Sequence, residues 1–274
     1  MRVTRRGFLL GMIGAGVAAS PAAWYGVVHE PNDIEIVRRK MHLPKLPARL
    51  DGTRAVQISD LHLKGASNLH SRLVDEVRKL DPAMILFTGD LIDDQSALND
   101  AVDIFKSWQP PAGIWAVPGN WDHTATGDQL EIISNRLKDA KVRMLINESA
   151  QLEDGLWIAG VDDPSSWNDD PREAIQDIPS GTAQILLAHS PDIVHSLEGG
   201  PTFGLILAGH THGGQVILPF FNGAWLKDGP AREYIEGLYE VHGSPMYVNR
   251  GIGTTTLPIR IGARPEITEF TFHA

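Results

Sequence analysis

The sequence predicts an α/β fold in which two mainly mixed β-sheets pack as a sandwich with helices on the outside. Short β-branched and apolar runs alternate with amphipathic helical stretches from residue 54 onward, which is typical of α/β domains. The chain has 274 residues, 42% of them hydrophobic, which is enough for a full core. A net charge of −10 is too small for a disordered chain of this composition.

The elements follow one another in a regular order. Strands are expected at 54–59, 84–87, 114–117, 184–188 and 205–208, and helices at 69–80, 97–108 and near 128–139. The first helix should end at Asp81-Pro82, because the residue before a proline disfavours the α conformation. Glu153-Asp154-Gly155 separates two strand-like runs and predicts a hairpin. Residues 233–273 should form short strands with glycine turns, the last at 266–272.

Composition excludes several kinds of chemistry. The chain contains no Cys, so disulfides, thiolate nucleophiles, iron–sulfur clusters and cysteine zinc sites are absent. The acidic balance argues against nucleic acid as a bulk electrostatic partner. The 11 His residues are therefore the notable feature, and their positions along the chain matter most.

Residues 1–28 are interpreted as a signal peptide or N-terminal anchor. Arg2, Arg5 and Arg6 precede a run, 8–28, without a charged side chain, and Thr4–Leu9 resembles a twin-arginine export signal. The alternative is an ordinary membrane anchor whose arginines follow the positive-inside rule. We expect export by the twin-arginine machinery to the periplasm or another extracytoplasmic space. Small residues at 20–22 would allow cleavage, but 8–28 is also long enough to remain as an anchor.

Residues 29–53 are expected to link this segment to a catalytic domain at 54–274. Pro31, Pro44 and Pro47 punctuate the stretch, and alternation around Ile34 and Ile36 favours an edge strand or strap.

Residue types that bind metals follow five of the expected strands. They are Asp60 and His62 after 54–59, Asp90 and Asp93 after 84–87, Asn120 and Asp122 after 114–117, His189 after 184–188, and His210 and His212 after 205–208. Ligands gather at the carboxyl ends of strands in open α/β sheets, so the five loops should converge on one crevice. One such cluster alone would be ordinary turn chemistry, but five in order predict a metal site.

The donor types narrow the choice of metal. Carboxylate, amide and imidazole donors without sulfur suit Mn, Fe, Zn or similar divalent ions. The set is too large for one ion and fits two. Two ions about 3.5–4 Å apart can clamp a phosphoryl group and supply a hydroxide for in-line displacement, with one aspartate as the bridge.

These motifs resemble those of a known enzyme family. Asp60-x-His62, Gly89-Asp90-x-x-Asp93, Gly119-Asn120-x-Asp122, His189 and Gly209-His210-x-His212 are similar to the ordered motifs of calcineurin-like metallophosphoesterases. The resemblance runs from about residue 50 to the C-terminus. Glu30-Pro31, the strap at 43–47, and residues 209–215, 249–253 and 264–266 resemble the YkuE-like bacterial branch, whose members are exported or membrane-associated. The family implies a four-layer αββα sandwich.

The resemblance also implies a role for each motif residue. Asp60, His62 and His212 would hold the first metal ion, Asn120, His189 and His210 the second, and Asp90 would bridge the two. Asp93 and Asp122 are expected instead to orient ligands or fix the loop geometry.

Trp121 departs from the family pattern, in which a histidine at this place contacts phosphate and protonates the leaving group. Tryptophan cannot donate a proton usefully at neutral pH. His123 could take over as the acid, or it could be a surface-loop histidine. Relatives that act on lipid-linked pyrophosphates also lack this histidine, so hydrolysis need not be lost. Trp121 therefore favours diesters or pyrophosphates over simple monoesters, and its ring could line a substrate pocket.

The sequence thus predicts an exported phosphoesterase with two divalent metal ions per chain, manganese among the candidates, in which a metal-bridging hydroxide attacks phosphorus in line. Expected substrates are phosphodiesters or phosphoric anhydrides of a membrane lipid or a cell-wall polymer. Two alternatives stay open. A pyrophosphatase for a nucleotide-linked lipid fits poorly with export, and a non-catalytic binding module, favoured by Trp121, fits poorly with the complete ligand set. Arg250 and Arg260 could contact phosphate or form surface ion pairs.

Overall fold

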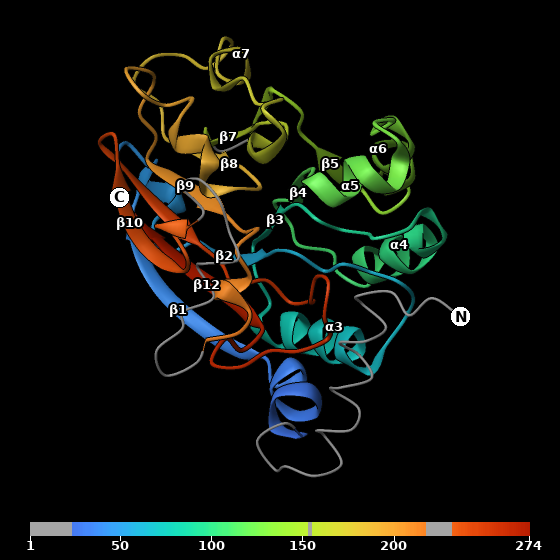
Figure 1. Ribbon diagram of the computed structural model, residues 1–274. Coiled ribbons are helices and arrows are strands. Elements are labelled where there is room, and N and C mark those ends of the chain that lie inside the picture. Colours follow the sequence, from blue (N-terminus) through green and yellow to red (C-terminus); the bar gives the residue numbers. More distant parts are fainter. Residues whose placement is uncertain (1–23, 153–154, 218–231) are drawn as a thin grey trace.

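Two six-stranded sheets pack face to face, and helices cover the outer sides (Figure 1). The computed structural model describes residues 24–152, 155–217 and 232–274. Both sheets mix parallel and antiparallel pairs. The predicted α/β sandwich is therefore confirmed.

The first sheet carries three of the motif loops. Its order is β1 (Glu35–His42), β12 (Glu266–His273), β2 (Arg54–Ile58), β3 (Met84–Thr88), β4 (Ile114–Val117) and β5 (Val142–Met144). Strands β2 to β5 run parallel, so the loops after β2, β3 and β4 leave from the same edge. Strand β1 lies at the edge of this sheet and belongs to residues 29–53, the segment expected to link the N-terminus to the domain.

The second sheet carries the other two motif loops. Its order is β10 (Gly237–Val241), β11 (Ser244–Val248), β9 (Leu205–Ala208), β8 (Gln184–Leu187), β7 (Trp157–Gly160) and β6 (Glu148–Gln151). Strands β7, β8 and β9 are parallel, whereas β10 with β11 and β6 with β7 are antiparallel. The β6–β7 pair is the predicted hairpin, although Glu153 and Asp154 of its turn lie outside the described residues.

Alternating side chains along each strand build two layers of core. In β3, Met84 and Leu86 pack between the sheets, whereas Ile85 and Phe87 face the helices. The helix layer consists mainly of α3 (Asn68–Leu80), α4 (Leu98–Lys106) and α6 (Glu131–Lys138). A third apolar cluster covers the outer face of the second sheet. Each fully buried large apolar side chain contributes about 1.5–3 kcal/mol to the stability of this frame.

Helix ends follow the sequence signals where these are strong. The Ser67 hydroxyl accepts from the His70 backbone N–H at the start of α3, and Asp81 closes the helix in the left-handed region at φ 44°. The residue pattern after β4 predicts only a metal-binding loop, whereas the structure contains a helix there, α5 (Asn120–Thr126). The sequence also does not indicate the short elements β5 and α7 (Pro171–Ala174).

The described chain begins at Trp24 and continues in a short π-helix, Tyr25–His29. Residues 1–23, which include the twin-arginine motif and most of the apolar run, lie outside the described residues. Over the described ranges, we find no helix with the length and apolar character needed to cross a bilayer.

Candidate metal centre

The five motif loops meet where strands of both sheets end. Asp60 follows β2, Asp90 follows β3, and Asn120 opens α5 after β4. His189 follows β8 and His210 follows β9, so the second sheet supplies most of the imidazoles. The side chains form two compact groups, and each could hold a metal ion.

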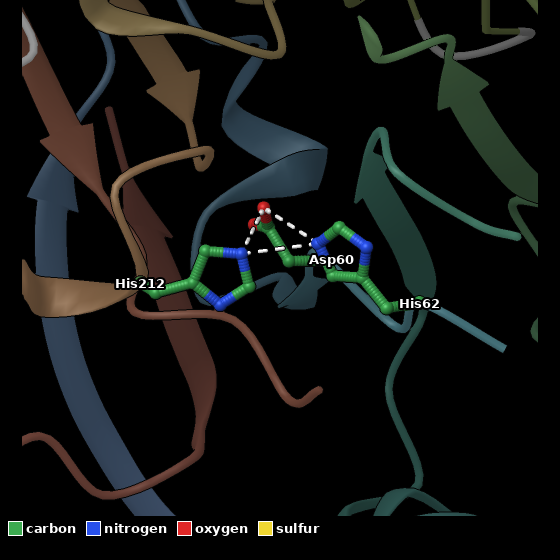
Figure 2. A group of neighbouring side chains, drawn as sticks. All are labelled: Asp60, His62 and His212. Carbon is green, nitrogen blue, oxygen red and sulfur yellow. Dashed lines mark hydrogen bonds and ion pairs between the residues drawn. The ribbon is translucent and has the colours of Figure 1, made fainter. Parts of the chain in front are cut away.

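The first group contains Asp60, His62 and His212, all buried. Figure 2 shows the two imidazole rings turned toward the Asp60 carboxylate. Asp60 Oδ1 lies 3.3 Å from His212 Nε2 and 3.9 Å from His62 Nε2. The two Nε2 atoms are 3.0 Å apart. Three donor atoms thus converge without an intervening side chain, which suits a small cation.

The second group contains Asp90, His189 and His210, and Asn120 joins it. Asn120 Oδ1 lies 3.2 Å from His189 Nε2 and 3.1 Å from His210 Nδ1. The two imidazole nitrogens are themselves 3.1 Å apart. This group therefore brings together a carboxylate, an amide oxygen and two imidazoles.

Asp90 connects the two groups. Its Oδ2 lies 3.4 Å from His62 Nε2 in the first group and 3.3 Å from His189 Nε2 in the second. Burial would raise the pKa of Asp90, but the imidazoles of His189 and His62 outweigh it and hold that pKa well below its usual range. Burial opposes a charge on His189 too, yet the Asp90 carboxylate raises the pKa of His189 to about 10. A single buried carboxylate oxygen thus faces both sets of nitrogen donors.

Two histidines are held in orientation by acceptors on the far side of the ring. Asp93 Oδ1 lies 2.7 Å from His62 Nδ1, and Lys64 Nζ pairs with the other Asp93 oxygen at 2.8 Å. The carbonyl of Thr88 lies 2.9 Å from His189 Nδ1. A proton held on Nδ1 leaves Nε2 free to bind a metal ion, so these acceptors select the tautomer that a ligand needs.

Asp122 points away from the donor atoms and binds backbone. Its carboxylate accepts from the N–H groups of Gly119, Leu91 and Ile92 at 2.9, 2.9 and 3.2 Å. These bonds join the loop that carries Asp90 to the start of α5, which carries Asn120. Burial, together with the nearby charge of Asp90, raises the pKa of Asp122 to about 7.

The backbone at the centre is strained. Five of the candidate ligands have left-handed φ values, namely Asp60 (53°), His62 (47°), Asp90 (56°), His210 (69°) and His212 (54°). Such a conformation costs a residue other than glycine about 1–2 kcal/mol. It persists where the surrounding structure over-determines it, and such residues cluster at functional sites.

Two glycines allow the loops to approach each other. A Cβ atom at Gly119 would collide with Asp90, and one at Gly209 would collide with Ser59 and Asp60. No larger residue fits at these two positions without moving a candidate ligand.

Two buried side chains that support the centre were not recognised from sequence as supports. Gln57 in β2 donates from Nε2 to the carbonyl of Ala208 in β9 at 2.9 Å and so ties the two sheets together below the loops. Arg260, completely buried, donates to the carbonyls of Ala263 and His212 at 2.9 and 3.4 Å and to three carbonyls within 250–253. Burial lowers the pKa of Arg260 to about 10, so it stays charged at neutral pH.

The two arginines considered for phosphate contact have other partners. Arg260 is neither a phosphate contact nor a surface ion pair, because its guanidinium is buried among backbone carbonyls. Arg250 forms ion pairs with Glu35, Glu236 and Glu266 at 2.7, 3.3 and 2.8 Å. A sequence carries no signal for such placements, because they depend on how distant loops pack.

Trp121 forms part of the wall of the centre. Its backbone N–H donates to Asp90 Oδ1 at 2.8 Å, and its ring packs edge-on against His62 with the centroids 5.7 Å apart. His123, two residues further along α5, has carboxylates at both ring nitrogens. Nε2 lies 2.7 Å from Asp162 Oδ1, and Nδ1 lies 3.2 Å from Asp128 Oδ1. The hydrogen bond with Asp162 raises the pKa of His123 and favours the imidazolium form.

The donor set fits two divalent ions. It offers carboxylate, amide and imidazole donors at short mutual distances, and one carboxylate oxygen lies against both groups. Most of these donors are buried, and such a concentration of polar atoms is costly unless an ion or protons compensate it. The fit therefore rests on the chemistry and placement of the donors themselves.

Comparison with known proteins agrees with this geometry. The family model of the calcineurin-like phosphoesterases matches residues 53–214, which contain every candidate ligand. The chain is a calcineurin-like phosphoesterase. The prediction of a phosphoester hydrolase of this family is thus confirmed.

Similarity to individual relatives indicates the branch of the family to which this phosphoesterase belongs. It is 33% identical to the metallophosphoesterase YkuE of Bacillus subtilis (strain 168), with 98% of each chain covered. It is 28% identical to the UDP-2,3-diacylglucosamine pyrophosphatase LpxG of Chlamydia trachomatis serovar D, covering 92% of this chain and 93% of LpxG. It is also 33% identical to a transmembrane protein with a metallophosphoesterase domain from Danio rerio, covering 90% of this chain and 59% of that protein. The predicted YkuE-like branch is confirmed.

Proposed function

We propose that this phosphoesterase hydrolyses phosphodiester or phosphoric-anhydride bonds in a cell-envelope or lipid-linked substrate. Seven side chains would hold two divalent ions: Asp60, His62 and His212 one, Asn120, His189 and His210 the other, and Asp90 both. When bound, such ions lower the pKa of a water molecule and neutralise charge on the phosphoryl group. The observation that carries the proposal is Asp90 Oδ2, which faces a nitrogen donor of each group.

The preference for phosphoric anhydrides over alkyl esters follows from Trp121. Its ring lies against His62, where it can contact a substrate group, but an indole supplies no proton at neutral pH. A leaving phosphate is stable as an anion, whereas a leaving alkoxide needs a proton. Loss of the usual acid therefore slows the hydrolysis of a simple alkyl monoester more than that of an anhydride.

His123 is the proposed proton donor for ester substrates. Its hydrogen bond with Asp162 at 2.7 Å raises the pKa of His123 and favours the imidazolium form, and α5 carries both His123 and the candidate ligand Asn120. The proton would pass from the imidazolium to the leaving oxygen, and the Asp162 carboxylate would stabilise the imidazolium before transfer.

A second candidate function is the cleavage of a pyrophosphate in a nucleotide-linked lipid. The similarity to LpxG over nearly the whole chain favours it. The twin-arginine-like N-terminus argues against it, because nucleotide-linked precursors are cytoplasmic. A non-catalytic binding module is disfavoured by the complete set of ligand-type side chains.

We also propose that the protein is exported by the twin-arginine route and can stay anchored through residues 8–28. The supporting observation is the sequence Thr4–Leu9 followed by an uncharged run. Replacing Arg5 and Arg6 together by lysine should retain the protein in the cytoplasm, as measured by cell fractionation. Unchanged export of this variant would contradict the proposed route.

Hydrolysis by the full chain tests the main proposal. The protein is stripped of metal, supplied with Mn, Fe, Zn, Ni or Mg, and assayed on bis(p-nitrophenyl) phosphate, p-nitrophenyl phosphate and UDP-2,3-diacylglucosamine. We expect two bound ions per chain and metal-restored cleavage of the diester above that of the monoester. Cleavage of the nucleotide-linked lipid alone would favour the second candidate. Full activity in correctly folded Asp90→Asn and His210→Ala variants would refute the proposed site.

A further inference from the structure

The first described residues present an apolar face to the outside of the molecule. Trp24, Tyr25 and Val28 are 51%, 43% and 42% exposed, and they are three of the five large hydrophobic residues that are exposed in the described ranges. They lie together on one side of the helical turn that includes the π-helix Tyr25–His29. Figure 1 shows this turn (blue) at the periphery of the sandwich.

The opposite side of the same turn is packed against the domain. Gly26 is buried, and a Cβ atom at this position would lie 2.7 Å from Ile261 Cγ1, so the helix and the loop that contains Ile261 are in close contact. The carbonyl of Gly26 accepts from the Arg260 backbone N–H at 3.0 Å. The turn therefore has one face fixed to the protein and one exposed, largely apolar face. On this face the His29 ring packs against the rings of Trp24 and Tyr25, and no other element of the described residues covers it.

Several further contacts keep the turn from swinging away. Glu30, which is 3% exposed, accepts from the Ala263 N–H at 2.8 Å. Asp33 pairs with Arg264 at 2.9 Å, and the Glu35 N–H donates to the Pro265 carbonyl at 2.8 Å. Residues 26–35 are thus joined in order to residues 260–265, which makes the junction rigid.

The same loop reaches the metal centre. The Arg260 side chain donates to the carbonyl of His212 at 3.4 Å, and Gln215 Nε2 donates to the carbonyls of Thr255 and Leu257 at 3.1 Å each. A short path of direct contacts therefore links the apolar face to a candidate metal ligand. The position of one relative to the other is fixed by the fold.

We infer that Trp24, Tyr25 and Val28 form a lipid-contacting surface that holds the metal-centre end of the domain against a membrane. The occupant of this face is the bilayer, because residues 7–23, which precede it directly, contain no Asp, Glu, Lys, Arg or His. Tryptophan and tyrosine are the side chains enriched at the membrane–water interface. This orientation of the domain toward the membrane suggests a phosphate carried by a membrane lipid as the substrate class. The substrate class rests on the proposed function, whereas the orientation of the domain does not.

The absence of cysteine allows a direct test with single labels on the full chain. Pro258→Cys places an environment-sensitive fluorophore on an exposed residue of the loop bonded to the turn. Ser180→Cys, also exposed, is the matched control, because it precedes β8 and so lies at the strand end opposite His189. Both proteins are bound to phosphatidylcholine–phosphatidylglycerol vesicles that contain a lipid with a quencher at its headgroup.

We expect the label at 258 to be quenched several-fold more strongly than the label at 180. Replacing Trp24, Tyr25 and Val28 together by serine should lower the quenching of the label at 258 to that of the label at 180, while the fraction of protein bound to vesicles stays the same. Trp24→Ser alone, a smaller change at an exposed position, should give part of this loss. Equal quenching at both positions, quenching that survives the triple substitution, or failure of the chain to bind vesicles would overturn the inference. The inference would also be overturned if the only effect of the triple substitution were the dissociation of a dimer.

Substrate assays keep this inference separate from the proposed function. The triple variant should cleave soluble bis(p-nitrophenyl) phosphate at the unaltered rate and lose activity only toward a phosphate ester embedded in vesicles. No turnover of any substrate by the unaltered enzyme would refute the proposed function and leave the quenching result intact.

Discussion

Replacing Asp93 by asparagine should weaken the binding of one metal ion although Asp93 is not a ligand. Asp93 Oδ1 lies 2.7 Å from His62 Nδ1, and the side chain is only 7% exposed. A contact this short to a carboxylate is a charge-assisted hydrogen bond. It fixes the ring of His62 with Nε2 toward Asp60 and Asp90. Loss of the charge should loosen that orientation and reduce the basicity of the ring.

The size of the effect follows from the type of contact. Removing a partner that orients a metal-binding histidine costs about 10–100-fold in metal affinity, which corresponds to about 1.4–2.8 kcal/mol. Asparagine retains a carbonyl oxygen that can accept from Nδ1, so Asp93→Asn should lie near the lower end, about 10-fold. Asp93→Leu removes the acceptor altogether and should approach about 100-fold.

The neighbouring Asp94 provides the matched control. It is exposed, and its carboxylate caps a short helix by accepting from the Ser96 N–H at 2.8 Å. Asp94→Asn therefore makes the same chemical change without touching His62. Metal-free protein titrated against a chromophoric chelator should show one ion weakened in Asp93→Asn and both ions unchanged in Asp94→Asn. Identical affinities in the two variants would refute the argument that Asp93 positions His62.

Three further outcomes are expected. The pKa of His123 is raised in the folded protein, so its pairing with Asp162 stabilises the fold fully below the unfolded-state pKa of about 6.5 and no longer does so once the pH exceeds the folded-state pKa. In urea unfolding, His123→Gln should therefore be less stable than the unaltered protein at pH 6, and the difference in unfolding free energy should vanish at alkaline pH. A difference that does not change with pH would contradict this. Arg260→Met leaves several buried carbonyls without a donor, which costs about 1–3 kcal/mol for each carbonyl. The melting temperature of this variant should fall by at least about 6–12 °C. Arg264→Met is the control, because its side chain is 37% exposed, and it should change the melting temperature little. Gly209→Ala forces a Cβ atom onto Ser59 and Asp60 and should abolish one metal ion in elemental analysis, whereas Gly199→Ala, where nothing lies within 4 Å, should keep both.

The strands and the order of the motif loops could be predicted from sequence because each depends on local patterns. β4 begins and ends where the apolar run predicts, at Ile114–Val117, and α3 ends before Asp81-Pro82. The grouping of ligand-type residues could also be predicted, because parallel strands bring their carboxyl ends to one edge. The helix α5 could not, since Asn, Thr and Gly around Asp122 favour a turn. In the structure, Asp122 accepts from the neighbouring Gly119 N–H and from the Leu91 N–H of a distant loop, and these bonds help to fix the segment.

Features that arise from contact between distant segments left no mark in the sequence. The left-handed backbone at Asp60, His62 and His212 is one such case, because nothing in a single residue indicates that neighbouring loops will force it there. Arg260 is the clearest case. The sequence favours a phosphate contact or a surface ion pair at this position, yet the fold buries Arg260 as a donor to the carbonyls of 250–253 and of His212. Its backbone N–H meanwhile holds Gly26, so a single residue connects the start of the described chain to the metal-binding loop. The desolvation free energy of the Arg260 guanidinium is offset only when all these segments are in place to accept its hydrogen bonds. The geometry of the candidate metal centre therefore depends on the complete fold and not on its motifs alone.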